Sequence, residues 1–167
     1  MSEGAATMLA ERRSHERPAR SPSRPVRVAQ VVTKLTAGAG GVALRGALSL
    51  DRDRFDTTIF AAEGGSLIPR AEEAGLNVIS LHYMAPGRRL YPWTDLQGVR
   101  EVTSHLAAGG FDLVHTHSAK AGALGRLAAR RVGAGAVVHT FHGFPFHQFQ
   151  SPLSRRALIE TERRLGR

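Results

Sequence analysis

The chain has 167 residues, with 23 Lys and Arg, 14 Asp and Glu, 8 His and no Cys. The absence of Cys excludes a disulfide scaffold and any thiolate metal site, and no apolar run is long enough to span a membrane. The net charge of +9 suggests a nucleic-acid partner, but most of the excess lies in residues 1–27 and 152–167. Because neither end carries stacking aromatic residues or a helix-turn-helix pattern, we expect solvated basic ends and no nucleic-acid partner.

Residues 1–25 are expected to form a disordered basic tail. They consist mainly of Arg, Ser, Pro, Ala and Glu, and Pro18, Pro22 and Pro25 interrupt any periodicity. Such a segment buries too little apolar surface to offset its ordering entropy. It also carries charges where a signal peptide requires an apolar core, so we expect a cytoplasmic protein.

From Val26 onward, short apolar segments rich in β-branched residues alternate with segments of helical periodicity. This alternation predicts an α/β fold, a Rossmann-like doubly wound parallel sheet with right-handed crossovers. Ligands bind at the carboxyl ends of the strands in such a sheet, so we look for the site there. A capping box at Thr94 is expected to start the helix that ends at Gly109 and Gly110, and Gly75 is expected to end an earlier one. The expected strands are 26–33, 57–61, 77–81, 111–116 and 136–140, and the other expected helices are 41–50, 67–74, 119–131 and 152–165.

The loop after the first strand is rich in glycine, which lets a backbone approach an anionic ligand closely at a helix start. Gly38, Gly40 and Ala43 fit the permissive dinucleotide pattern G-x-G-x-x-A, and Glu63 ends the second strand near where a ribose-binding acid is expected. A stand-alone nucleotide- or NAD-binding domain is therefore one interpretation. Against it, residues 34–37 separate the strand from the first glycine, whereas the dinucleotide turn is tight.

Two histidines lie at the end of the fourth expected strand. Alternation along a strand places His115 and His117 on one face and Thr116 on the other, and Ser118 is a suitable N-cap for the helix that follows. A His-x-His pair on a strand is also a zinc-binding pattern, so a non-enzymatic protein with a histidine metal site is a further alternative. Acidic residues are sparse nearby, so such a site would need other histidines.

A third group of residues follows the fifth strand, in the run HTFHGFPFH at 139–147. His142 precedes Gly143, which permits a sharp turn and an open approach. The imidazole of His142 could hydrogen-bond a hydroxyl, carry a proton or hold a phosphate. If the fourth and fifth strands are neighbours, the histidines of both strand ends converge.

The run DLVHTHSAKAGALGRLAAR at 112–130 closely resembles the N-terminal domain of family-4 glycosyltransferases of GT-B architecture. The run VVHTFHGF at 137–144 is similar to the strand and His-Gly turn that follow it in that family, and Gly40-Gly41-Val42 resembles the family's loop after the first strand. The resemblance extends in order over residues 26–167. It implies transfer of a sugar from a nucleotide-sugar donor, with retention at the anomeric carbon, to a glycan, lipid-linked or small-molecule acceptor.

By resemblance, residues 26–151 form the Rossmann-like acceptor-side domain, and 152–167 form a terminal helix leading toward an absent C-terminal domain. No cofactor or metal is expected, because backbone amides and basic side chains stabilise the departing diphosphate in that family. The resemblance also suggests peripheral contact with an anionic inner-membrane surface, which the basic ends would suit. It implies one catalytic residue, His142, and these substrate-binding residues: Lys34, Gly40, Gly41, His117, Ser118, Lys120 and Gly143.

Two departures from the family pattern are visible. Ala43 stands where many members carry Glu after the glycine pair, so any contact of that carboxylate is missing. The chain also stops at Arg167, before the half that would hold most of the nucleotide sugar. We therefore expect little or no transferase activity from this chain alone.

Overall fold

The computed structural model describes residues 24–84, 91–143, 146 and 149–166. Nearly all of the expected tail lies outside this range. Its end is described, and there the Arg24 guanidinium forms two hydrogen bonds of 2.8 Å with the Asp112 carboxylate. The backbone N–H of Arg27 donates to the same carboxylate, also at 2.8 Å. Asp112 therefore ties the beginning of the first strand to the segment before the fourth.

The described residues form the expected α/β fold, a five-stranded sheet in the order β3-β2-β1-β4-β5. All four strand pairs are parallel, so β4 and β5 are neighbours and their carboxyl ends meet at one edge. The strands are β1 (Val26–Lys34), β2 (Phe55–Ala62), β3 (Asn77–Leu81), β4 (Leu113–His117) and β5 (Ala136–Thr140). The helices are α1 (Ala39–Ser49), α2 (Ile68–Glu73), α3 (Pro92–Gly109), α4 (Ala119–Val132) and α5 (Pro152–Leu165).

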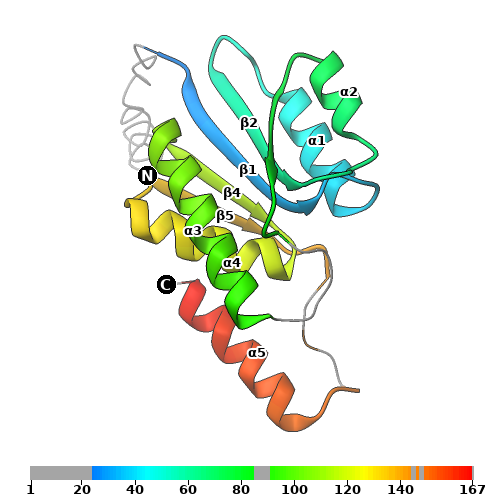
Figure 1. Ribbon diagram of the computed structural model, residues 1–167, viewed down its shortest axis with the longest axis vertical. Coiled ribbons are helices and arrows are strands. Elements are labelled where there is room, and N and C mark those ends of the chain that lie inside the picture. The colour runs from blue at the N-terminus through cyan, green and yellow to red at the C-terminus, as the bar shows by residue number, and fades with distance from the viewer. Residues whose placement is uncertain (1–23, 85–90, 144–145, 147–148, 167) are drawn as a thin grey trace, which may run out of the picture.

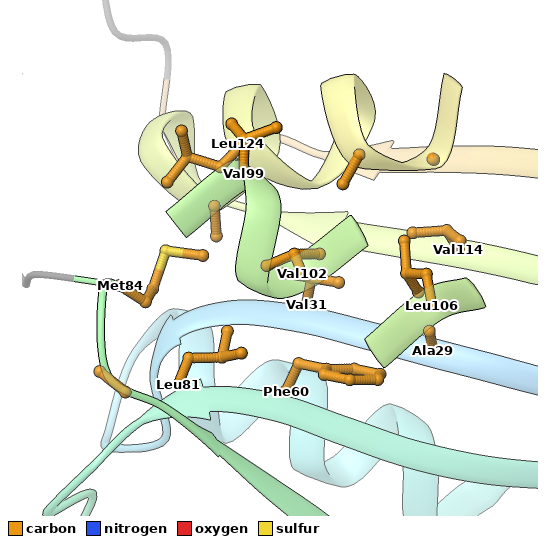
Figure 2. Packing of buried hydrophobic residues seen from close by; sticks show 14 residues of the cluster. Ala29, Val31, Phe60, Leu81, Met84, Val99, Val102, Leu106, Val114 and Leu124 are labelled. Atoms are coloured by element: carbon orange, nitrogen blue, oxygen red, sulfur yellow. The ribbon is translucent and has the colours of Figure 1, made fainter. Parts of the chain in front are cut away.

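Helices cover both faces of the sheet (Figure 1): α1 and α2 lie on one face, and α3 and α4 on the other. Strand alternation divides the core between them. Ala29 and Val31 of β1 point toward α3 and α4, whereas Val32 packs on the side of α1. Figure 2 shows Phe60 of β2 in the larger cluster, with Val102 and other apolar residues around it.

Close packing of α4 depends on two glycines. A Cβ at Gly125 would lie 2.7 Å from Cγ2 of Thr116, and one at Gly122 would lie 2.3 Å from Cε1 of His139. Both distances are below ordinary contact. The small residues therefore let α4 lie directly against β4 and β5.

The start of α3 differs from the expectation. The capping box at Thr94 is wrong, because the helix begins at Pro92 with Tyr91 as its N-cap. Proline suits the first helical turn, and the Asp95 carboxylate accepts a 2.8 Å hydrogen bond from the Tyr91 backbone N–H. Gly75 and Gly110 follow the ends of α2 and α3 with positive φ, as expected.

The last helix, α5, packs on α4 through a largely buried ion pair. Arg126 on α4 lies 2.7 Å from Glu162 on α5, and their side chains are only 6% and 13% exposed. Arg126 Nε also donates to the Gly122 carbonyl at 2.8 Å, and Arg130 donates to the Arg164 carbonyl at 2.7 Å. The terminal helix is thus attached to this domain by polar contacts. Within the described part of the chain, none of the helices combines the length and apolar character needed to cross a bilayer.

Candidate functional site

A cavity of about 530 Å³ lies at the carboxyl edge of the sheet, beside the N-terminus of α1. The loop before α1 and most of that helix, as far as Leu48, form one side, and α2 with its preceding loop contributes another. His142, which follows β5, completes the lining. The residues that matter for the chemistry are Gly38, Gly41, Arg45, Leu67, Arg70 and His142.

The α1 N-terminus offers this cavity a partial positive charge. Gly38 is its N-cap, with φ +73°, and no described side chain caps the helix by a hydrogen bond. The first-turn N–H groups and the helix dipole favour an anion at such a position. The exposed guanidinium groups of Arg45 and Arg70 add two full positive charges to the lining. The cavity is therefore electrostatically suited to a phosphate or diphosphate.

The two glycines of the expected Gly-Gly pair do different things. A Cβ at Gly40 would lie 2.7 Å from the Lys34 carbonyl oxygen, so Gly40 is needed for α1 to lie close to the end of β1. Gly41 lines the cavity, and a Cβ there would come no closer than 3.4 Å to the nearest atom outside its own turn. Of the pair, only Gly41 faces ligand space directly.

The histidines of β4 and β5 converge, as the sequence suggested. His115 and His117 lie on the same face of β4, with ring centroids 4.2 Å apart. His117 stacks on His142 at 5.3 Å, and its Nδ1 lies 3.1 Å from Nε2 of His142. The Nε2 of His115 lies 2.8 Å from the Thr140 hydroxyl. Histidines from two strand ends thus form one contiguous group, of which His142 lines the cavity.

Burial keeps the inner histidines neutral. His117 is 2% exposed, and burial, with smaller charge repulsion from the neighbouring histidines, lowers its pKa to about 3. Burial and repulsion from His142 also lower the pKa of His115. These rings therefore act as hydrogen-bonding groups at neutral pH and carry no positive charge.

Ser118 occupies the N-cap position of α4, as expected, but its side chain does not cap the helix by a hydrogen bond. Its backbone has φ 67° and ψ 166°, a region that residues with a Cβ seldom adopt. Among the described residues it is the one non-glycine with positive φ. The turn between β4 and α4 is therefore strained next to the histidine group.

Lys120 is buried in an ion pair rather than open to the cavity. Its Nζ lies 2.9 Å from Oδ1 of Asp95, and the two side chains are 4% and 11% exposed. The ammonium also lies 5.4 Å from the Tyr91 ring centroid. Lys120 thus joins the N-terminus of α4 to that of α3.

The remaining predicted residues are spread around the edge. Lys34 is the last residue of β1 and is half-buried, and it is not among the cavity-lining residues. Gly143 is exposed, with φ +132°, which provides the sharp turn after His142. The Glu63 carboxylate lies 3.2 Å from Nε2 of His82, and Glu63 is not among the cavity-lining residues. Of the third group of residues, Phe144, Pro145 and His147 lie outside the described residues.

His82 also contacts Glu101 of α3, at 3.1 Å. Burial acts to raise the pKa of Glu101, but hydrogen bonds from the backbone N–H groups of Tyr83 and His82 hold it below its usual value. In the described parts of the chain, no group of three or more His, Cys, Asp or Glu residues is arranged to hold a metal ion. The histidine metal-site alternative therefore gains no support from the described geometry.

Sequence reasoning missed Gln30, Arg45 and Arg70. Gln30 is a 3% exposed polar residue in the apolar strand β1, and its Oε1 lies 2.6 Å from Nε2 of His117. A glutamine within a run of Val and Ala was the available signal for it. The two arginines gave none, because only the folded arrangement of α1 and α2 brings them to one cavity.

Parallel sheets of this kind bind ligands at the carboxyl ends of their strands, and the cavity lies at that edge. A family model described as a glycosyl transferase 4-like domain matches residues 37–167, and the chain belongs to that family. The chain is 32% identical over 122 residues to UDP-Gal:alpha-D-GlcNAc-diphosphoundecaprenol alpha-1,3-galactosyltransferase of Escherichia coli. That alignment covers 72% of this chain and 31% of the relative.

Solved structures share the fold at low identity. MurG of Acinetobacter baumannii matches with a TM-score of 0.60 and 17% identity, over 82% of this chain and 39% of that one. A glycosyltransferase from Rickettsia africae ESF-5 matches with a TM-score of 0.57 and 21% identity, over 75% of this chain and 32% of that one. The chain therefore has the fold of one half of a GT-B glycosyltransferase and spans about a third of the length of these relatives.

Proposed function

We propose that this chain supplies the acceptor-side domain of a retaining glycosyltransferase that uses a nucleotide-sugar donor and a lipid-linked or other sugar acceptor. Membership of the glycosyl transferase 4-like family supports the reaction class. The name of the E. coli relative, which pairs UDP-Gal with a GlcNAc-diphosphoundecaprenol acceptor, supports the choice of ligands. The observation that carries the proposal is the cavity that joins His142 to the α1 N-terminus and two arginines.

The cavity is proposed to take a diphosphate group, which occurs both in nucleotide sugars and in lipid diphosphate-linked acceptors. The N–H groups of the first turn of α1, near Gly41, are placed to donate to phosphate oxygens. Arg45 and Arg70 would neutralise the remaining charge, and Arg suits phosphate because its fork of donors matches two oxygens. This charge stabilisation uses backbone and arginine donors, so no metal enters the proposed mechanism.

His142 is proposed to contact the sugar. It lines the same cavity as Arg45 and Arg70, and its ring stacks on that of His117. Ser118 and Lys34 are proposed to border the acceptor, beyond the cavity. For Lys120 the buried pairing with Asp95 favours a role in fixing the α3 and α4 N-termini over direct contact with an acceptor.

A cytoplasmic location with peripheral contact at an anionic membrane is part of the same proposal. It is supported by the diphosphoundecaprenol in the relative's name and by the basic terminal regions. Co-sedimentation with vesicles containing anionic lipid, at low and high salt, checks it. Binding lost at high salt is expected, and equal recovery with neutral vesicles would count against an electrostatic contact.

Ligand binding to the purified chain tests the cavity. Chemical shifts and calorimetry would be measured with UDP-galactose, with UDP, and with a short-chain prenyl diphosphate-linked GlcNAc, which separates donor from acceptor. Arg45→Gln and Arg70→Gln are each expected to weaken binding about tenfold, the loss of roughly one charge-assisted hydrogen bond. Arg100→Gln is the matched control, because Arg100 is exposed on α3 at the other face of the sheet. Saturable binding that ignores both cavity arginines, or an absence of binding for all three ligands, would overturn the proposal.

A further inference from the structure

A hydrogen-bonded chain runs across neighbouring strands from the buried Gln30 to the exposed His142. Gln30 of β1 contacts His117 of β4, with 2.6 Å between Oε1 and Nε2. His117 in turn contacts His142, with 3.1 Å between Nδ1 and Nε2. The first two residues are 3% and 2% exposed, whereas His142 is exposed and lines the cavity.

The chemistry of the amide oxygen sets the direction of this chain. An amide oxygen only accepts, so the proton at the first contact is on Nε2 of His117. A neutral imidazole carries one N–H, so Nδ1 of His117 is an acceptor, and the proton at the second contact is on Nε2 of His142. The Gln30 amide nitrogen points the other way, toward α1, where it would lie 3.9 Å from a Cβ at Gly46.

We propose that Gln30 and His117 are positioning residues that hold His142 in its Nε2–H tautomer, leaving its Nδ1 as the acceptor nitrogen. The proposal rests on the proposed function only in treating His142 as the residue that meets ligand. Neither Gln30 nor His117 touches ligand itself. Their effect is to decide which hydrogen bond His142 can form.

Neutrality of His117 is necessary for this arrangement. A protonated His117 would donate from both nitrogens. Nε2 of His142 would then have to accept, which requires the Nδ1–H tautomer of His142. The low pKa of His117, caused mainly by burial, keeps the ring neutral throughout the physiological range. The β4–β5 ladder extends to the pair His117 and Thr140, so it fixes the end of β5 two residues before His142.

The tautomer has a consequence for the kind of group bound. An acceptor nitrogen receives a hydrogen bond from a hydroxyl, such as those of a sugar, but offers nothing to a phosphate oxygen, which is itself an acceptor. His142 would then select the sugar portion of a ligand, while the diphosphate lies toward Arg45 and Arg70.

Imidazole ¹⁵N spectra of the histidine-labelled chain at pH 7.5, without ligand, test the proposal directly. Long-range ¹H–¹⁵N correlations distinguish the protonated from the unprotonated ring nitrogen, and comparison with His142→Gln identifies the His142 signals. The expected result is protonated Nε2 and unprotonated Nδ1 at both His117 and His142. An Nδ1–H tautomer at His142, or an even mixture, would overturn it.

Two substitutions at Gln30 separate positioning from general packing. Gln30→Glu puts a carboxylate beside Nε2 of His117, which favours the protonated ring; Nδ1 of His117 then also donates, and His142 is expected to change to its Nδ1–H tautomer. Gln30→Leu removes the acceptor and is expected to convert His142 to a mixture. An unchanged His142 spectrum in Gln30→Leu would contradict the proposal, and if that variant fails to fold, the unmodified chain and Gln30→Glu still decide. Because no ligand is needed, the outcome is independent of whether the diphosphate assignment is correct.

Discussion

Acid destabilisation through His117 can be predicted from its burial. The pKa is about 3 in the folded chain and about 6.5 in an unfolded one, so between these values the unfolded state binds more protons. Above about pH 6.5 the burial of neutral His117 has no protonation cost, and the free energy of unfolding falls as the pH drops from 6.5 toward 3. For these two pKa values, the free energy of unfolding falls by about 2 kcal/mol between pH 7 and pH 5 through this one group.

Urea unfolding of the unmodified chain and of His117→Gln at pH 7 and pH 5 measures this contribution. A glutamine amide can still donate to Gln30 but does not titrate, so the variant isolates the proton. The pH-dependent loss is expected to be about 2 kcal/mol smaller in His117→Gln. The lowered pKa values of His115 and His139 act in the same direction and remain in both proteins. Equal losses in the two proteins would refute the inference that His117 is buried as a neutral ring.

Other substitutions probe the packing and the ion pairs. In urea unfolding, Gly125→Ala is expected to lower the free energy of unfolding by about 1–3 kcal/mol through overpacking, whereas Gly46→Ala, in an exposed position of α1, is expected to raise it by up to about 1 kcal/mol. Lys120→Met is expected to lower it by about 3–5 kcal/mol, because Asp95 keeps a buried charge, and adding Asp95→Asn is expected to recover part of this loss. In Glu162→Gln, amide hydrogen exchange in α5 is expected to become faster while exchange in the sheet stays unchanged. Similar stability of the two glycine variants, a stable Lys120→Met, or unchanged exchange in α5 would contradict the respective contact.

The sheet was predictable because the strands are short runs rich in β-branched and other apolar residues, and because they alternate with helical segments. The segments 26–33 and 136–140 coincide almost entirely with β1 and β5. The start of α3 was not predictable in the same way. Thr94 has the side chain of an N-cap, but the helix already begins at Pro92. The Asp95 carboxylate accepts from the Tyr91 backbone N–H, a contact that is not part of the Ser/Thr capping pattern.

The site was predictable where strand alternation governs it and not elsewhere. His115 and His117 share a face because a strand has a period of two. Lys120, by contrast, stands at the same helix start as Ser118 but turns inward, because Asp95 from a distant helix offers it a buried partner. Arg45 and Arg70 converge only through the packing of α1 and α2, a tertiary relation that carries no local sequence signal.

Substitutions of Ser118 test whether its hydroxyl caps α4, as the sequence pattern suggests, or whether its strained backbone determines their effect on stability. If its hydroxyl capped α4, Ser118→Ala would lower the free energy of unfolding by about 1 kcal/mol, and Ser118→Gly would change it by only a few tenths. The structure has no such hydrogen bond at Ser118, and its φ of 67° and ψ of 166° carry a strain of about 1–3 kcal/mol for a residue with a Cβ.

Glycine removes that strain but gains entropy in the unfolded chain, worth about 0.5–1 kcal/mol. Ser118→Gly is therefore expected to raise the free energy of unfolding by about 0.5–2 kcal/mol, and Ser118→Ala to leave it nearly unchanged. Both are measured by urea unfolding at pH 7.5. Loss of stability in Ser118→Ala, with none gained in Ser118→Gly, would mean that the hydroxyl caps α4 after all. A stabilised Ser118→Gly would instead mean that this strand end, beside the histidine group, holds its turn at the expense of stability, as strained residues at functional sites commonly do.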